Sequence, residues 1–177
     1  MSRISHIFFI STLAIYFYVV QAPIFSQEVE ISKKQLIPRF VTIKSNRANT
    51  RIGPGKIYTV VCTYLIRGLP VEIIQEYENW RQIRDVDGTT GWINKILLSN
   101  KRSAIVSPWN RKEKNRPYID LHQKPETQSI VVAKVEPGVL LTIRECSGEW
   151  CFGYNSDVEG WIKQKKIWGI YPGEVFK

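Results

Sequence analysis

Short apolar runs alternate with turn-forming residues along the chain, and no stretch shows helical periodicity. The runs are rich in β-branched and aromatic side chains, which predicts β-strands. In the first half they occupy residues 39–43, 57–65, 71–74, 80–86 and 89–93. Turn residues separate them, including Asp87-Gly88, a typical hairpin signal. Five short strands in one stretch predict a small antiparallel barrel.

Residues 46–56 interrupt this pattern with two Gly, one Pro and two Asn. We expect an ordered loop here, because these residues favour turn conformations over strands.

The same pattern occurs a second time. In each copy a Gly opens an apolar run, a Trp follows, and a Gly-Trp-Ile triplet closes the hairpin. Gly68 and Gly138 are 70 positions apart, as are Trp80 and Trp150, whereas Gly91 and Gly160 are 69 apart. Such a period indicates two similar structural units. The predicted fold is all-β, with two five-stranded antiparallel barrels in tandem.

The expected domain boundaries follow from this repeat. They are a signal peptide at 1–26, a first unit at 38–99, a linker at 100–117, and a second unit at 118–177 that includes the C-terminal tail. The aromatic tail, 168–173, is expected to pack on the second barrel or across both.

The first residues are typical of an export signal. Arg3 precedes a largely apolar run of 14 residues, 7–20, which carries no charge. The run is short for a membrane span and has the length of a signal-peptide core. We place cleavage after Ser26, and an uncleaved anchor is the alternative. The mature chain is expected to have no transmembrane segment and to be periplasmic or secreted.

The net charge and the expected export together limit the classes of molecule that this chain could bind. Removing 1–26 deletes Arg3 and no acidic residue, which changes the formal net charge from +9 to +8. In the cytosol such a charge would suggest nucleic acid. Export argues against nucleic acid as the partner. The polyanions that an exported protein can meet are lipid headgroups and cell-wall carboxylates. The alternative is a charged surface that only maintains solubility.

The chain has three cysteines, and an oxidising compartment permits a disulfide between two of them. Cys146 and Cys151 flank a four-residue turn, which sets them opposite each other across a hairpin. We expect these two to be bridged. Cys62 lies in an apolar run and is expected to be a buried thiol, with an intermolecular bridge as the alternative.

Catalysis has little support in the sequence. After signal removal His122 is the only histidine, and the chain lacks H-E-x-x-H, C-x-x-C and phosphate-loop motifs. Asp85 and Asp87 lie at a predicted turn, where Asp is expected for backbone reasons. We therefore expect no enzyme activity, no metal and no cofactor.

These motifs resemble the bacterial SH3 domain. The resemblance rests on Asn49-x-Arg51-x-Gly53-Pro54-Gly55, Gly68-x-Pro70-Val71-Glu72-Ile73-Ile74, Asn79-Trp80, Asp87-Gly88 and Gly91-Trp92-Ile93. Residues 38–175 further resemble exported bacterial proteins with tandem SH3-like domains, through Cys146–Cys151 and the tail Trp168-Gly-Ile-Tyr-Pro-Gly-Glu174.

The resemblance implies an SH3-like barrel in each half and a binding function, often toward cell-wall peptides. Two features depart from the family pattern. Residues 121–125 replace the R-x-G-P core of the loop in the second unit, and Asn94 and Lys163 stand where eukaryotic peptide-binding SH3 domains usually have Pro. Recognition of proline-rich peptides is therefore not expected.

Candidate ligand-binding residues come from the first unit. Trp80 and Ile83 are three apart and so face opposite ways on a strand, which puts Trp80 outside if Ile83 fills the core. Tyr58, Tyr64 and Arg51 are expected to join Trp80 in one groove. The alternatives are that Trp80 caps the barrel and that Arg51 bonds to its own unit.

We expect a non-catalytic exported module that binds peptidoglycan peptides, with Lys163, Lys165 and Lys166 favouring their carboxylates. The alternative is a structural or protein-interaction adaptor that docks on an envelope protein.

Overall fold

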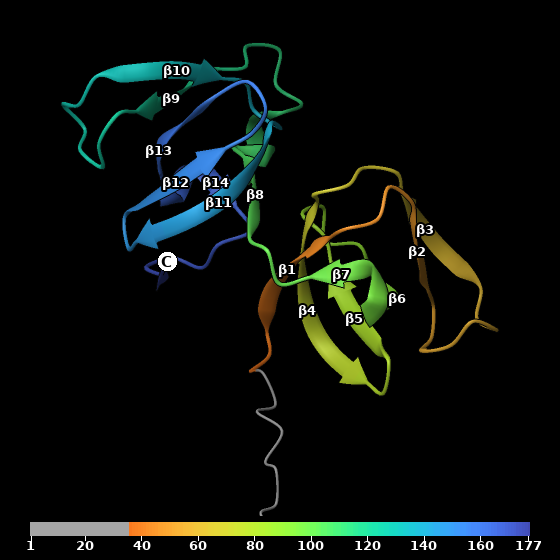
Figure 1. Cartoon of the computed structure of the whole chain (residues 1–177). Coiled ribbons are helices and arrows are strands. Elements are labelled where there is room, and N and C mark those ends of the chain that lie inside the picture. Colours follow the sequence, from red (N-terminus) through yellow and green to blue (C-terminus); the bar gives the residue numbers. More distant parts are fainter. Residues whose placement is uncertain (1–35) are drawn as a thin grey trace, which may run out of the picture. The chain divides into compact units, whose positions relative to one another are not determined.

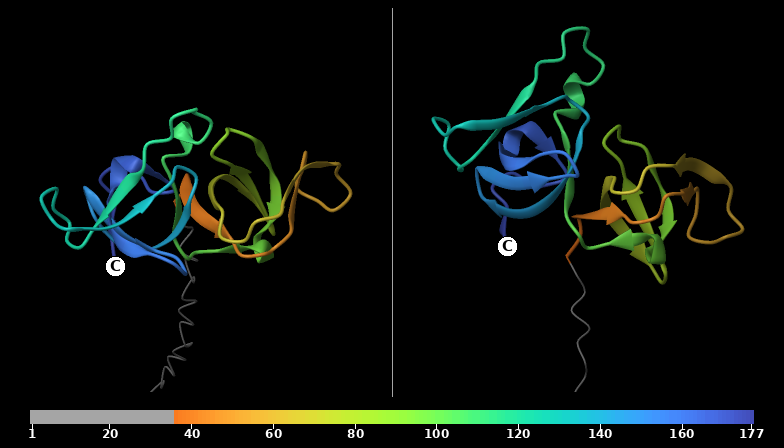
Figure 2. Two further views of the ribbon diagram at one scale, coloured as in Figure 1. Left: turned by 90° about the horizontal axis from the view of Figure 1, so that it is seen from above. Right: turned by 45° about the horizontal axis from the view of Figure 1, so that its top comes forward.

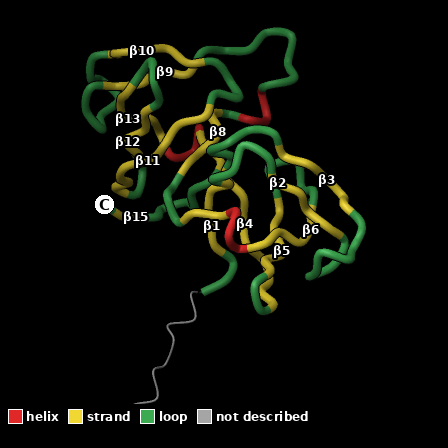
Figure 3. The backbone as a smooth tube through the Cα atoms, turned by 45° about the vertical axis from the view of Figure 1, so that its right-hand side comes forward, coloured by secondary structure: helices red, strands yellow, loops and turns green. Residues whose placement is uncertain are grey.

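The computed structural model describes residues 36–177, and their regular structure is β-strand apart from three short 3₁₀ turns (Figures 1 and 3). The prediction of an all-β chain with two tandem SH3-like units is therefore confirmed. The expected signal peptide, 1–26, lies outside the described residues. Within 36–177 there is no helix of the length and hydropathy that a membrane crossing requires.

The first sheet holds seven antiparallel strands in the order β3-β2-β6-β5-β4-β1-β7 (Figure 1). The strands are β1 (Arg39–Ile43), β2 (Ala48–Arg51), β3 (Val60–Tyr64), β4 (Pro70–Tyr77), β5 (Trp80–Arg84), β6 (Thr90–Asn94) and β7 (Leu98–Ser99). The 3₁₀ turn η1 (Lys95–Leu97) connects β6 to β7.

The second sheet has the order β10-β9-β13-β12-β11-β8-β14, and β15 pairs with β11 outside this path. Its strands are β8 (Ser103–Val106), β9 (Ile119–His122), β10 (Val131–Val135), β11 (Leu140–Ser147), β12 (Trp150–Tyr154), β13 (Glu159–Lys163), β14 (Ile167–Trp168) and β15 (Val175–Phe176). The 3₁₀ turns are η2 (Pro108–Asn110) and η3 (Gln164–Lys166).

The two sheets repeat one topology, and this changes the position of the predicted linker. Strand β8 pairs with β11 and β14, as β1 pairs with β4 and β7. The second sheet therefore begins at Ser103, inside the segment 100–117 that was expected to connect the units. All four residues of β8 are buried. The run Ser-Ala-Ile-Val is too short and too unlike β1 to stand out as the first strand of a repeat.

Neither sheet closes into the expected barrel. In the first sheet β3 and β7 are the end strands, and β2 reaches β6 through one residue pair, Arg51 with Trp92. The hairpin of β2 and β3 extends away from the other strands of its sheet (Figure 2). The strand order is SH3-like, and the edge formed by β3 remains open.

Strand β2 also differs from the expected loop at 46–56, because its residues Ala48–Arg51 pair with β3. Ala48 and Thr50 are buried, whereas the residues next to them are partly exposed. Partners in the sheet and this alternating burial outweigh the weak strand preference of Asn and Arg.

Each sheet encloses its own apolar core. The first core is formed by Val41, Ile43, Ala48, Val71, Ile73, Ile83, Ile93 and Leu98. The second contains Ala104, Val106, Ile119, Leu121, Val135, Leu141, Ile143, Cys146, Cys151, Ile162, Ile167 and Ile170. Alternate strand residues supply these side chains. Full burial of one such aliphatic side chain stabilises the fold by about 1.5–3 kcal/mol.

The C-terminal tail packs across both sheets, the second of the two arrangements expected from its aromatic residues. Phe176 pairs with Cys146 where β15 joins β11. The Tyr171 hydroxyl donates to Glu72 Oε1 at 2.7 Å, and the Tyr171 ring lies 4.7 Å from the Phe40 ring.

Candidate functional site

A groove on the outer face of the first sheet brings two of the predicted site residues together. We call it the Trp80 groove, and its volume is about 560 Å³. Its lining residues are Arg47, Asn49, Arg51, Lys56, Trp80, Asn94, Ile96 and Leu97. Three of these are cations and none is an acid.

The strand register places Trp80 and Arg51 on this face. Trp80 is paired with Asn94 across β5 and β6, and Arg51 is paired with Trp92 across β2 and β6. Paired residues share a face of a sheet, and side chains alternate along a strand. Ile83 therefore lies on the opposite face, where it is fully buried. Trp80 is half-buried, which leaves part of its indole accessible to a ligand.

The glycines of the β2–β3 loop are needed because the Tyr58 ring packs directly on them. A Cβ atom at Gly53 would lie 2.7 Å from that ring, and one at Gly55 would lie 3.2 Å from it. Arg51 Nη1 donates to the Tyr58 carbonyl oxygen at 2.6 Å. Tyr58 is 39% exposed but lies outside the lining of the groove. Its ring and carbonyl instead shape the loop next to Arg51.

The groove has an unbalanced positive charge. Within residues 36–177, Arg47, Arg51 and Lys56 take part in no ion pair with an acidic side chain. Arg47 and Lys56 are exposed, and Arg51 is half-buried. A guanidinium presents a planar set of donors that matches a carboxylate. The groove therefore has the chemistry to hold an anionic ligand that carries an apolar group.

Asn94 starts the 3₁₀ turn that forms one wall of the groove. Its side-chain oxygen accepts a hydrogen bond from the backbone N–H of Ile96 at 3.1 Å. This short turn presents Ile96, which is 68% exposed, and Leu97 to the groove. In the sequence Asn94 stands out only as a departure from Pro, and Ile96, Arg47 and Lys56 were not predicted as site residues. No local motif marks these residues, because the sheet brings them together.

Tyr64 lies elsewhere, and the expectation that it joins Trp80 in one groove is wrong. It is paired with the buried Ala48, so it faces the core side of the sheet. Its hydroxyl donates to Asp85 Oδ2 at 3.0 Å. Burial, followed by the Asp85 charge and this hydrogen bond, raises the pKa of Tyr64 far above its usual range. Tyr64 lines a separate cavity of about 280 Å³ that also contains Asp85 and Arg111.

The equivalent groove in the second unit is filled by its own side chains. Trp150 and Lys163 occupy the places of Trp80 and Asn94, and His122 occupies that of Arg51. The His122 ring lies 5.2 Å from the Trp150 ring, and Lys163 Nζ lies 5.3 Å from it. Trp150 is consequently 6% exposed. Residues 121–125, which replace the R-x-G-P core of the first unit's loop, include His122, one of the side chains that fill this groove.

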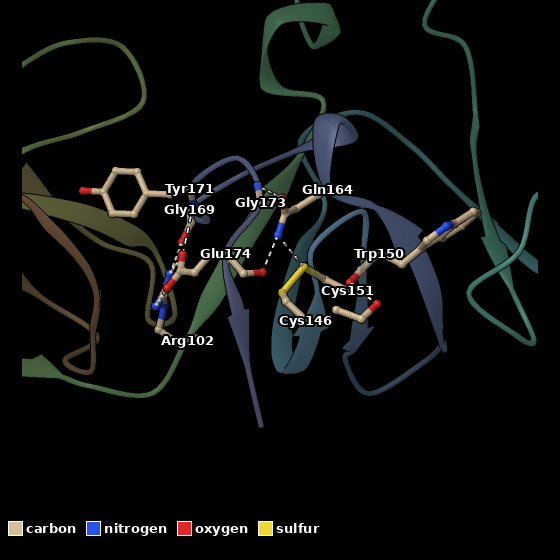
Figure 4. The surroundings of a disulfide bond; sticks show 10 residues. Arg102, Cys146, Trp150, Cys151, Gln164, Gly169, Tyr171, Gly173 and Glu174 are labelled. Atoms are coloured by element: carbon tan, nitrogen blue, oxygen red, sulfur yellow. Dashed lines mark hydrogen bonds and ion pairs between the residues drawn. A yellow bond between two sulfur atoms is a disulfide. The ribbon is translucent and has the colours of Figure 1, made fainter.

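The predicted disulfide is confirmed. Cys146 and Cys151 are bonded across the β11–β12 hairpin, and Cys62 is a free, half-buried thiol. Gln164 connects this hairpin to the tail (Figure 4). Its Nε2 donates to the Glu174 carbonyl oxygen at 2.9 Å and lies 3.8 Å from Cys151 Sγ, while its Oε1 accepts from the Gly173 N–H at 2.6 Å.

Two of the three lysines proposed for carboxylate binding lie at a cavity beside the tail. This cavity measures about 570 Å³, and its apolar lining comes mainly from β14 and the tail. Lys163 and Lys165 line it, and so does Glu149. Because Glu149 offsets part of the lysine charge, the cavity is less selective for anions than the Trp80 groove. In the described part of the chain, no cluster of His, Cys, Asp and Glu is suited to a metal ion.

Sequence comparison gives one family. The model of the bacterial SH3 domain matches the chain twice, at residues 44–100 and 117–169, which together exceed half of the chain. No curated protein is significantly similar to this sequence.

Two solved structures resemble the chain with low TM-scores. NlpC2 from Trichomonas vaginalis has 10% sequence identity and a TM-score of 0.33, over 74% of this chain and 48% of that protein. An NlpC/P60 family protein from Bacillus cereus ATCC 10987 has 10% identity and a TM-score of 0.32, over 72% of this chain and 55% of that protein. The chain thus spans about half the length of each, and neither likeness bears on its function.

Proposed function

Because the chain belongs to the bacterial SH3 domain family, we propose that it is an exported, non-catalytic binding protein whose first unit recognises peptides of the cell wall. Its place of action is the periplasm or the exterior of the cell. The ligand in this proposal is a peptidoglycan stem peptide, which carries carboxylates and small apolar side chains.

The Trp80 groove is the observation that supports this proposal. Trp80 offers apolar surface at a low entropic cost, and Arg51, Arg47 and Lys56 offer charge to a carboxylate. These cations have no acidic partner of their own in the described part of the chain. A ligand carboxylate therefore does not have to displace an existing ion pair. In the second unit the corresponding Trp150 is covered by His122 and Lys163, so the proposal places the ligand on the first unit.

Co-sedimentation with purified peptidoglycan sacculi tests the proposal. We expect pelleting at low salt that weakens at moderate salt, because exposed charge–charge attraction is screened. Trp80→Ala removes the aromatic surface and is expected to weaken binding about tenfold or more, as for a buried aromatic contact. Trp109→Ala is the matched control, since Trp109 is 54% exposed and lies outside the groove.

Failure to pellet at either salt concentration would contradict the proposal. Equal loss of binding in both tryptophan variants would also contradict it, because the groove would then have no special role.

The alternative function is that of an adaptor that docks on another envelope protein. The uncharged, exposed strand at the open edge of the first sheet favours it, and that strand is independent of the Trp80 groove.

A further inference from the structure

Strand β3 forms an open edge of the first sheet. It is the first strand in the order of that sheet and pairs with β2 on one side only, within the described residues (Figures 1 and 3). An edge strand presents a row of backbone N–H and C=O groups that another strand can pair with. Natural proteins usually protect such edges with charged side chains, Pro or a covering segment.

The β3 edge lacks the usual charged protection. The ten residues 57–66 read IYTVVCTYLI and contain no charge and no Pro. The segment 52–66 also contains seven of the large apolar side chains that are exposed in the described chain. These are Ile52, Ile57, Tyr58, Val60, Val61, Leu65 and Ile66. An edge of this composition is suited to strand pairing and to apolar contacts on both faces.

The second unit provides an internal comparison, because β10 occupies the same place in its sheet. Thr63 and Asn49 in the first unit correspond in register to Lys134 and Asp120 in the second. Lys134 Nζ lies 4.0 Å from Asp120 Oδ1, whereas Thr63 donates a neutral hydrogen bond to Asn49 Oδ1 at 2.9 Å. The edge of β10 therefore carries a charged pair, and the edge of β3 does not.

The charges at the ends of the β3 segment indicate its partner. Lys56 precedes the uncharged ten residues and Arg67 follows them. Strand β3 itself spans Val60–Tyr64, and Lys56 and Arg67 lie in the turns before and after it. If two copies paired antiparallel along β3, the turn with Lys56 would lie beside the turn with Arg67 of the other copy. Parallel pairing would place like residues beside each other. Both arrangements bring cations together, which disfavours a second copy and favours a strand with acidic ends.

We propose that β3 binds an extended segment of another protein by strand addition, and that this segment is β-branched in its middle and acidic at both ends. The main-chain hydrogen bonds of the added strand extend the first sheet, and its carboxylates lie near Lys56 and Arg67. This site shares Lys56 with the Trp80 groove, but no residue of β3 lines that groove, and strand addition does not depend on the ligand of the groove.

A synthetic peptide tests this proposal directly. The probe has the sequence Glu-Glu-Thr-Val-Thr-Val-Thr-Val-Glu-Glu with blocked ends and a fluorescent label, and its control replaces each Glu by Lys. We expect saturable binding of the acidic peptide, with the lysine peptide at least about tenfold weaker because it meets like charges. Amide exchange of residues 60–64 is expected to slow when the acidic peptide binds.

Two variants at one exposed position separate strand addition from simple charge attraction. Thr63→Lys and Thr63→Glu each place a charge on the pairing edge, and β10 has Lys in the corresponding position. We expect both to weaken binding about tenfold or more, because a charged edge disfavours strand pairing. Attraction by charge alone would make the Lys variant bind the acidic peptide more tightly, which would overturn the proposal.

Trp80→Ala is expected to leave binding of the acidic peptide unchanged, so a failure at the groove is distinguishable from a failure at the edge. Unchanged binding in both Thr63 variants would overturn the proposal. A concentration-dependent dimer that Thr63→Lys abolishes would also overturn it, because a second copy would then be the occupant. Far-UV circular dichroism of each variant verifies that it remains folded.

Discussion

At the scale of single residues, the Gly-Trp-Ile triplet owes its glycine to a close approach of two strands. A Cβ atom at Gly91 would lie 2.8 Å from Thr50 Cβ, and one at Gly160 would lie 3.0 Å from Leu121 Cβ. These positions bring β6 against β2 and β13 against β9. The glycine recurs in both units because, in each, two strands that are distant along the chain pack closely at this position.

Replacement of this glycine is expected to destabilise the first unit. In Gly91→Ala the added methyl group overlaps Thr50, and overpacking of this kind costs about 1–3 kcal/mol. Urea unfolding of the variant should give a lower midpoint than the wild type. Thr90→Ala is the control, because Thr90 is an exposed neighbour on the same strand. A midpoint equal to that of the control would contradict the predicted overlap.

The candidate site shows how far the positions of single side chains could be predicted from the sequence. Strand alternation correctly gave Trp80 a face opposite to Ile83. The face of Tyr64 was predicted wrongly because it depends on the partner Ala48 in β2, a segment that was expected to be a loop. The positions of Arg47 and Lys56 near Trp80 depend on how β2 pairs with β3 and β6, which no local pattern encodes.

At the scale of elements, the C-terminal tail is held by one carboxylate that accepts hydrogen bonds from several donors. Glu174 accepts hydrogen bonds from Arg102 at 2.5 and 2.9 Å and from the Tyr171 N–H at 3.0 Å. Burial of this carboxylate opposes its ionisation. The hydrogen bonds from Arg102 and Tyr171 and the Arg102 charge outweigh the burial and lower the pKa of Glu174. Figure 4 shows Arg102, Glu174 and Tyr171 together beside Gly169.

The lowered pKa predicts a pH dependence of stability. The folded protein binds the Glu174 proton more weakly than the unfolded chain, so this contribution is complete above the usual Glu pKa of about 4.3. It disappears as the pH falls through the lowered pKa of the folded state. Near neutral pH, Glu174→Gln is expected to reduce Tm by about 2–4 °C, since a partly exposed ion pair contributes about 1 kcal/mol.

Thermal unfolding between pH 7 and pH 2 checks this expectation. The difference in Tm between the wild type and Glu174→Gln should shrink across the acidic range. Glu159→Gln is the control, because Glu159 lies in an exposed pair 3.8 Å from Arg144. A difference that stays constant with pH would show that the Glu174 charge does not stabilise the tail.

Elements with strong local patterns were predicted better than those that depend on their partners. Strands β4, β5 and β6 contain apolar and aromatic residues and are bounded by turn residues, and all were expected from the sequence. Strands β2 and β8 were expected as loop and linker. Each is four residues long, and each is held by neighbouring strands rather than by its own composition.

At the scale of the whole molecule, the two units share one strand topology but differ in the outer face of the sheet. In the first unit Trp80 borders an open groove with three cations. In the second unit Trp150 is covered by His122 and Lys163 and is part of the packed interior. The repeat therefore conserves the strand order, while the residues at corresponding positions decide whether a groove is open or filled.

This difference predicts that the same substitution destabilises the two units to different extents. Trp150→Ala leaves a void among buried rings and is expected to cost about 3–5 kcal/mol. Trp80→Ala removes a half-buried ring and is expected to cost about 1 kcal/mol, an average value for a substitution. Urea unfolding followed by far-UV circular dichroism compares the two variants. If Trp80→Ala destabilised the protein as much as Trp150→Ala, Trp80 would be a core residue and the groove assignment would be wrong.

The sequence by itself determined the all-β class, the tandem repeat, the bacterial SH3 resemblance and the Cys146–Cys151 disulfide, because each depends on spacing along the chain. Only the tertiary structure decided that the sheets stay open, that β8 belongs to the second unit, and that Trp80 shares a groove with Arg51 while Tyr64 does not. These outcomes depend on which strands are neighbours and in what register they pair. That choice minimises the free energy of the whole domain, and no short segment records it.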